Sequence, residues 1–200
     1  MAGNNQHSQL IVAAASRLLA DHQTLDYGWA RRKAAENLGI NVSDRQLPSL
    51  AEIEAAVIEH QQIFSPDSPL LMQQLTAAAE LLQDFRKFSP RLVGPLTRGV
   101  TAGNAVISIH CFAEAAKLVL FDIMDAGIRA ESGDVMIITS NRKREERPAF
   151  SFFHGDQEVL VIVLGLDEYR HPPLDPVTEK PAYGLDADAL ARRLAEAEAG

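Results

Sequence analysis

Residues 91–112 read RLVGPLTRGVTAGNAVISIHCF, and the hydrophobic pattern changes from helical to strand-like just before them. Before it, apolar residues recur with helical spacing, whereas from about Phe88 onward they come in short runs typical of strands. Two such runs, Arg91–Gly94 and Val106–Phe112, flank a loop that contains glycines. We therefore expect two strands here, and we place the change from helices to sheet after residue 88.

The residues before this stretch predict four amphipathic helices. Ser49 and Glu52 have the spacing of a capping box, in which each side chain satisfies a free backbone amide of the other residue. Ser68-Pro69 combines a capping serine with a proline at the first helical position, and Gly39 suits a helix C-terminus. The helices are expected over residues 10–19, 27–38, 50–64 and 69–85.

The residues after it predict one helix packed on a sheet. A helix is expected over Glu114–Ala126 and further strands over residues 135–138, 150–153 and 159–164, the last two joined as a hairpin. The predicted fold class is α+β. It has a four-helix region (residues 1–88), a mixed sheet with a packed helix (89–170), and a proline-rich loop with a short C-terminal helix (171–200).

Composition restricts the classes of function. Hydrophobic residues make up 46% of the chain and charged residues 23%, as in globular proteins with a buried core. The net charge of −8 would repel a phosphate backbone and disfavours general nucleic-acid binding. A single cysteine, Cys111, excludes an intrachain disulfide and a cysteine-rich zinc site. The polar start lacks a signal-peptide pattern and the longest apolar run, Val159–Leu166, is too short for a membrane span, so we expect a cytoplasmic protein without membrane contact.

Residues 94–109, GPLTRGVTAGNAVISI, resemble the motif G-S-x-x-R-G-x-A-x-x-x-S-D-h-D-h of metal-dependent nucleotidyltransferases of the DNA polymerase beta type. Gly94, Arg98, Gly99 and Ile107 match it without a gap. The stretches at residues 25–27, 109–113 and 173–176 also look like those of an uncharacterised proteobacterial group of nucleotidyltransferase-like proteins. The resemblance implies a nucleotidyltransferase-like core in a bacterial protein.

The sequence departs from this family at the positions that carry its chemistry. In the family, a serine contacts the triphosphate, and two aspartates on one face of a strand hold magnesium ions that promote the transfer. Those positions are here Pro95, Val106 and Ser108, which supply no carboxylate. A third carboxylate would come from a later strand, where Asp134 and Asp156 are the nearest candidates. We expect no catalytic residue, no metal ligand and no cofactor.

The remaining motif positions are candidates for ligand binding: Gly94, Arg98, Gly99, Ser108 and His110. Arg98 suits a small anion, and its alternative is an ion pair with a nearby carboxylate. His110 would share a face with Ser108, and its alternative is a buried histidine bonded to a backbone carbonyl. The basic run Asn141–Arg147 contains two glutamates and is expected to be a solvated hairpin.

Three hypotheses about function follow. The preferred one is a nucleotidyltransferase-like protein without catalytic activity, which binds a small anionic ligand or a protein partner through the degenerate cleft. The second is an active nucleotidyltransferase that uses magnesium and carboxylates not placed by the motif. The third is an interaction module in which the helical region binds a partner. Fold alone does not decide among the three.

Overall fold

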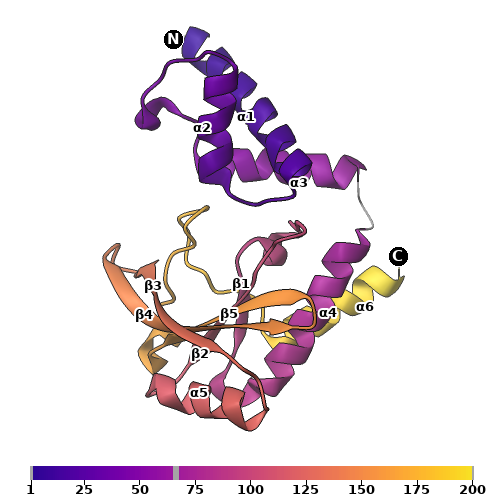
Figure 1. Cartoon of the computed structure of the whole chain (residues 1–200), viewed down its shortest axis with the longest axis vertical. Coiled ribbons are helices and arrows are strands. Elements are labelled where there is room, and N and C mark those ends of the chain that lie inside the picture. Colours follow the sequence, from indigo (N-terminus) through magenta and orange to yellow (C-terminus); the bar gives the residue numbers. More distant parts are fainter. Residues whose placement is uncertain (1, 65–67, 200) are drawn as a thin grey trace. The chain divides into compact units, whose positions relative to one another are not determined.

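The computed structural model describes residues 2–64 and 68–199, and in this part of the chain the fold is α+β (Figure 1). The helices are α1 (Ala2–His22), α2 (Tyr27–Asn37), α3 (Leu50–Phe64), α4 (Pro69–Asp84), α5 (Ala116–Asp125) and α6 (Ala187–Ala199). The strands are β1 (Arg91–Val93), β2 (Ile107–Phe112), β3 (Glu131–Ile138), β4 (Arg144–His154) and β5 (Gln157–Leu164). No helix in the described part of the chain has both the length and the apolar character needed to cross a membrane.

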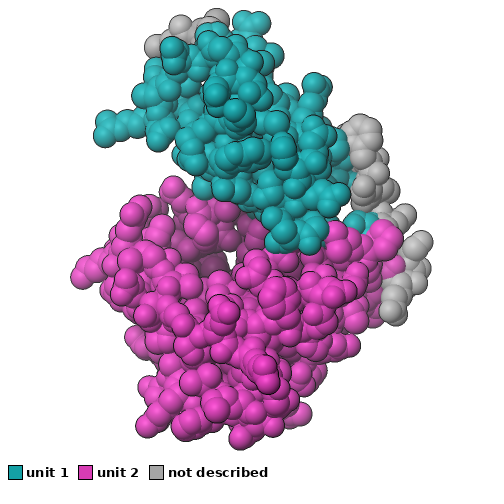
Figure 2. Space-filling model, viewed as in Figure 1, with its two compact units in different colours: residues 1–68, 100–104 teal, residues 69–99, 105–200 magenta. Residues whose placement is uncertain are grey.

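The chain forms two compact units (Figure 2). The helical unit comprises residues 1–68 and 100–104, and the sheet unit comprises residues 69–99 and 105–200. The division therefore follows residue 68, whereas the sequence placed the end of a helical region at residue 88. The difference arises because α4 buries Leu75, Leu81 and Leu82 in the core of the sheet unit. Helical periodicity shows which face of a helix is apolar but does not show what that face packs against.

The helical unit is built from α1, α2 and α3. Ile11, Ala30 and Ile53 are almost fully buried between these helices. The expected capping box starts α3, since the Glu52 amide donates to Ser49 Oγ over 3.2 Å and the Ser49 amide donates to Glu52 Oε2 over 2.8 Å. Asp26 caps α2 by accepting from the Trp29 amide over 2.8 Å.

The sheet unit contains a mixed sheet with the strand order β1-β2-β5-β4-β3. Strand β2 pairs with β5 in parallel, and the other neighbouring strands are antiparallel. The expected hairpin joins β4 to β5 through a tight turn at Gly155, whose φ of +58° favours glycine. Helices α4, α5 and α6 contribute to the core that covers one face of this sheet.

The alternation expected along β2 is confirmed. Ile107, Ile109 and Cys111 are fully buried in the core shared with the helices. Ser108 and His110 occupy the positions between them and therefore point to the opposite face. This arrangement places two of the candidate ligand-binding residues on the face that α4, α5 and α6 do not cover.

The proline-rich stretch after β5 is held in place by backbone hydrogen bonds. Leu174 donates from its amide to the Ile138 carbonyl over 2.7 Å, so the stretch bridges to the end of β3. Further along, Leu185 and Leu92 exchange two backbone hydrogen bonds of 2.9 and 2.8 Å. Asp186 then caps α6 by accepting from the Ala189 amide over 2.8 Å. These contacts bring residues 171–186 close to the sheet.

Candidate functional site

The segment between β1 and β2 forms a short 3-10 helix, η3 (Pro95–Arg98), with a glycine at each end. Gly94 has a φ of +82° and Gly99 a φ of +79°, conformations that favour glycine over any residue with a Cβ. Thr97 closes the turn by donating from Oγ1 to the Gly94 carbonyl over 2.7 Å, and Arg193 of α6 donates to the Thr97 carbonyl over 2.7 Å. Backbone conformation by itself therefore accounts for both glycines.

Arg98, at the end of η3, forms an ion pair with Asp175. Arg98 Nη1 lies 3.1 Å from Asp175 Oδ2, and the Asp175 side chain is only 7% exposed. The other carboxylate oxygen, Oδ1, accepts from the amides of Val177 and Thr178 over 2.9 and 2.8 Å. Asp175 is thus a fixed, buried carboxylate whose two oxygens are already engaged.

An ion pair with a nearby carboxylate was the alternative role expected for Arg98. Arg98 does form an ion pair, but its partner, Asp175, is not close to it in the sequence. The two residues are 77 positions apart in the chain. Asp175 was not a candidate site residue, and the only sequence signal for it was its place in the stretch Pro173–Pro176 that carries part of the family resemblance. The spacing of residues within one helix or strand cannot predict a contact between two residues so far apart in the chain.

His110 is buried beside this ion pair. Burial lowers the pKa of His110 to about 4, because the charged imidazolium loses its hydration, and the nearby negative charge of Asp175 opposes the shift only in part. The ring is therefore neutral at pH 7. Its Nδ1 atom is buried and has no hydrogen-bond partner within the described part of the chain. A buried polar atom without a hydrogen bond lowers the stability of the folded state. Nδ1 of His110 is thus a hydrogen-bonding position that the described part of the chain does not use.

We refer to Arg98, Asp175, His110 and Ser108 together as the Arg98 cluster. Ser108 is half-buried two residues before His110 on the same face of β2. Arg98 and Asp175 are in contact, the charge of Asp175 acts on His110, and Ser108 is placed with them by its position on β2. Gly94 and Gly99, the other predicted site residues, lie at the ends of the turn that carries Arg98.

The residues of this site do not fit a magnesium ion. Asp134 lies on β3, which β5 and β4 separate from β2, so at roughly 4.8 Å per strand it is about 14 Å from the strand that carries Ser108. Asp156 lies in the exposed turn between β4 and β5. Among the described residues, no group of three or more His, Cys, Asp or Glu side chains is arranged to hold a metal ion. Asp134 therefore does not reach the strand that carries Ser108 and His110.

Cys111 does not belong to this cluster. Its side chain is fully buried on the helix-covered face, opposite to His110. Burial raises the pKa of the Cys111 thiol, and the negative charge of Asp122 raises it further. Since the thiolate is the nucleophilic form, Cys111 is an inert core residue at neutral pH.

The basic run at residues 141–147 leads from the β3–β4 turn into β4. Arg147 donates to both carboxylate oxygens of Glu168 over 3.2 and 3.1 Å and to Glu145 over 2.7 Å. These hydrogen bonds raise the pKa of the Arg147 guanidinium. A cavity of about 530 Å³ opens beside this network, lined also by Thr139, Asn141 and other polar residues. The charge of Arg147 is thus balanced within the chain, which disfavours a role in nucleic-acid binding.

The helical unit contains a separate groove of about 650 Å³ between α1 and α3. Val12, Ala13, Ala55 and Ala56 contribute its apolar part, and Arg17, Glu52 and Glu59 contribute charges. A groove between two helices is a common binding place for a partner segment.

Comparisons with known proteins leave the family undecided. No model of a protein family matches the chain, and no curated protein matches it.

Proposed function

We propose that the sheet unit is a degenerate nucleotidyltransferase-like domain that binds a small anionic ligand through the Arg98 cluster without transferring a nucleotide. The observation that carries the proposal is the buried, unpaired Nδ1 of His110 beside the Arg98–Asp175 ion pair. The segment that resembles the motif also lies where two strands were expected around a glycine-containing loop, since β1, η3 and β2 follow one another.

The chemistry of the cluster favours a small ligand with an anionic group. The planar guanidinium of Arg98 suits carboxylate or phosphate oxygens, and the Ser108 hydroxyl and the His110 ring provide neutral hydrogen-bonding groups. Asp175 offsets the charge of Arg98, so the electrostatic attraction for an anion is reduced. We therefore expect weak binding, with a dissociation constant of roughly millimolar order.

The same cluster argues against transfer chemistry. Nucleotide transfer in the resembled superfamily depends on metal ions held between protein carboxylates and the triphosphate. Val106 and Ser108 supply no carboxylate, and both oxygens of Asp175 are occupied by Arg98 and by backbone amides. An active enzyme would need carboxylates that the described residues do not bring to this site.

The helical unit supports a second candidate function. The groove between α1 and α3 is lined by both apolar and charged side chains, a combination that suits an amphipathic segment of a partner protein. This activity would be independent of the Arg98 cluster, because the described residues that line the groove belong to α1 and α3.

Ligand binding can be tested on the imidazole of His110 by nuclear magnetic resonance of ¹⁵N-labelled protein. Adding inorganic phosphate or ATP without metal is expected to shift the His110 ring signals and the Ser108 amide signal in a saturable way. Arg98→Gln should weaken this binding about tenfold or more, the loss typical for a charge-assisted hydrogen bond. Arg142→Gln is the matched control, because the Arg142 side chain is 72% exposed and lies in the β3–β4 turn. Equal weakening by both variants, or no response at His110, would contradict the proposal.

A further inference from the structure

Helix α5 is apolar on both of its faces. Val119 and Ile123 are fully buried against the sheet, as expected for the inner face of a surface helix. The outward face carries Leu118, Phe121 and Met124, which are 43%, 54% and 60% exposed. A surface helix normally places charged and polar residues there. Three large apolar side chains exposed on one helix face form a candidate interaction surface. We call these three residues the α5 stripe.

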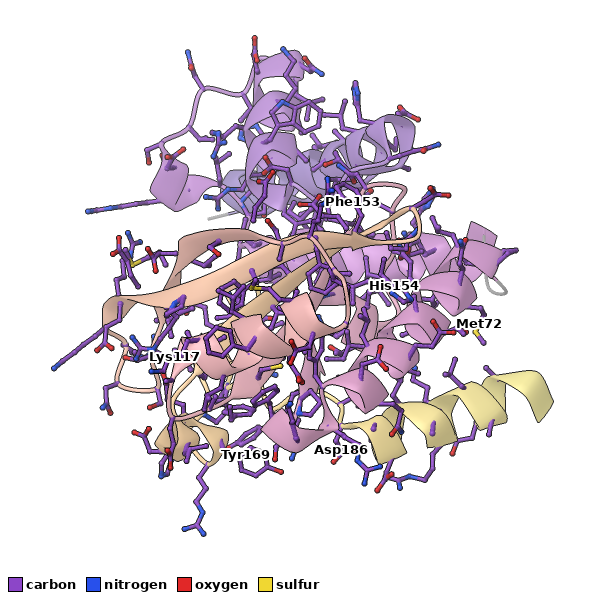
Figure 3. The ribbon with its side chains drawn as sticks, turned by 60° about the horizontal axis from the view of Figure 1, so that its bottom comes forward. Met72, Lys117, Phe153, His154, Tyr169 and Asp186 are labelled. Carbon is purple, nitrogen blue, oxygen red and sulfur yellow. The ribbon has the colours of Figure 1, made fainter. Side chains whose placement is uncertain are left out.

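Charged residues lie at the two ends of this stripe with opposite signs. Lys117, next to the N-terminal end of α5, is exposed (Figure 3), and Asp125, at the C-terminal end, is exposed as well. Asp122 is not available for a contact with a partner, because Lys87 of the same chain forms an ion pair with it. The surface therefore has an apolar middle, a positive end and a negative end.

This distribution is complementary to itself when two copies of α5 pack antiparallel. With the two-fold axis at Phe121, each Phe121 faces its own copy, and Leu118 faces Met124 because the two lie three residues on either side of Phe121. Lys117 and Asp125 lie four residues on either side, so each lysine faces an aspartate of the other copy. A parallel arrangement would instead bring like charges together. Interfaces between identical chains commonly use one patch in this self-complementary way.

We propose that the α5 stripe is the interface of an antiparallel, two-fold symmetric homodimer. The acidic character of the chain, with a net charge of −8 and Asp125 at the rim, disfavours an anionic lipid surface as the occupant. Lys117 and Asp125 fix the direction of the helices, and Leu118, Phe121 and Met124 supply the apolar area.

The oligomeric state of the full chain tests this proposal by sedimentation equilibrium over a range of concentrations. The wild type is expected to form a dimer, and Phe121→Asp is expected to be monomeric over the same range. Phe153→Asp is the matched control, because Phe153 is also an exposed aromatic residue of the sheet unit, 69% exposed on β4, but lies outside the stripe. A wild type that stays monomeric, or a Phe121→Asp variant that still dimerises, would overturn the proposal.

A charge exchange makes the test independent of any loss of folding. Lys117→Asp and Asp125→Lys should each weaken the dimer about tenfold, because each change places two pairs of like charges in the symmetric interface. The double variant Lys117→Asp with Asp125→Lys should restore the wild-type dissociation constant to within about threefold. No recovery in the double variant would contradict the antiparallel arrangement.

Discussion

Lowering the pH from 6.5 to 4 is expected to reduce the free energy of unfolding by about 3 kcal/mol, because His110 becomes protonated more easily in the unfolded chain than in the folded protein. The folded protein holds the pKa of His110 at about 4, whereas the unfolded chain has the ordinary value of 6.5. Protons therefore bind more tightly to the unfolded chain. The stability is fully present well above pH 6.5, falls as the pH drops through 4, and levels off only once the pH is well below the folded pKa of about 4.

Urea denaturation at a series of pH values measures this effect. His110→Gln should remove the additional slope between pH 6.5 and 4, so the difference between wild type and variant isolates the contribution of the ring. His154→Gln is the control, because His154 lies at the surface with Nε2 3.0 Å from Glu80. Parallel curves for wild type and His110→Gln would show that the imidazole is not buried in its neutral form.

Replacing Gly184 by alanine is expected to destabilise the protein by roughly 2–5 kcal/mol. Gly184 has a φ of +65°, and a Cβ there would overlap the carbonyl oxygen of Leu92 and lie 2.9 Å from Val93 Cγ1. The change would push apart Leu92 and Leu185, whose two hydrogen bonds join the segment before α6 to β1. Strand β1, which this connection holds, directly precedes the turn that carries Arg98.

Gly127→Ala serves as the matched control for this substitution. Gly127 has a φ of +73°, but a Cβ at this position would meet nothing within 4 Å. Only backbone strain of about 1–2 kcal/mol is then expected. Thermal or urea unfolding of both variants separates strain from steric overlap, and equal losses would mean that the close approach of residue 184 to β1 does not hold the fold together.

Local patterns in the sequence predicted most of the secondary structure. The capping box at Ser49 and Glu52, the hairpin around Gly155 and the alternation along β2 depend on neighbouring residues, and the structure has all three. Strand β3 begins at Glu131, earlier than the expected residue 135, because Glu131, Ser132, Gly133 and Asp134 pair with β4 although they carry no apolar pattern. An edge strand can continue on backbone pairing alone, which periodicity does not detect.

The parts that the sequence did not predict depend on contacts between distant residues. The assignment of α4 to the sheet unit follows from packing of its apolar face, and the ion pair of Arg98 depends on a loop 77 residues further along the chain. The candidate residues Ser108 and His110 could be placed on one face of β2 from strand alternation. The carboxylate that completes the cluster, Asp175, could not, since sequence spacing carries no information about loop closure over such a distance.

The Arg98 cluster is proposed to bind a small anion without metal and to transfer no nucleotide. Calorimetric titration with magnesium and nucleoside triphosphates, combined with an assay for labelled product, tests it most directly. The wild type is expected to give no magnesium-dependent heat and no product. Val106→Asp with Ser108→Asp should create measurable magnesium binding, because Ser108 lies in β2 and Val106, two residues earlier, directly precedes this strand. Robust nucleotide transfer by the wild type, abolished by replacing Asp134 or Asp156, would show that the protein is an active nucleotidyltransferase and would contradict the proposal.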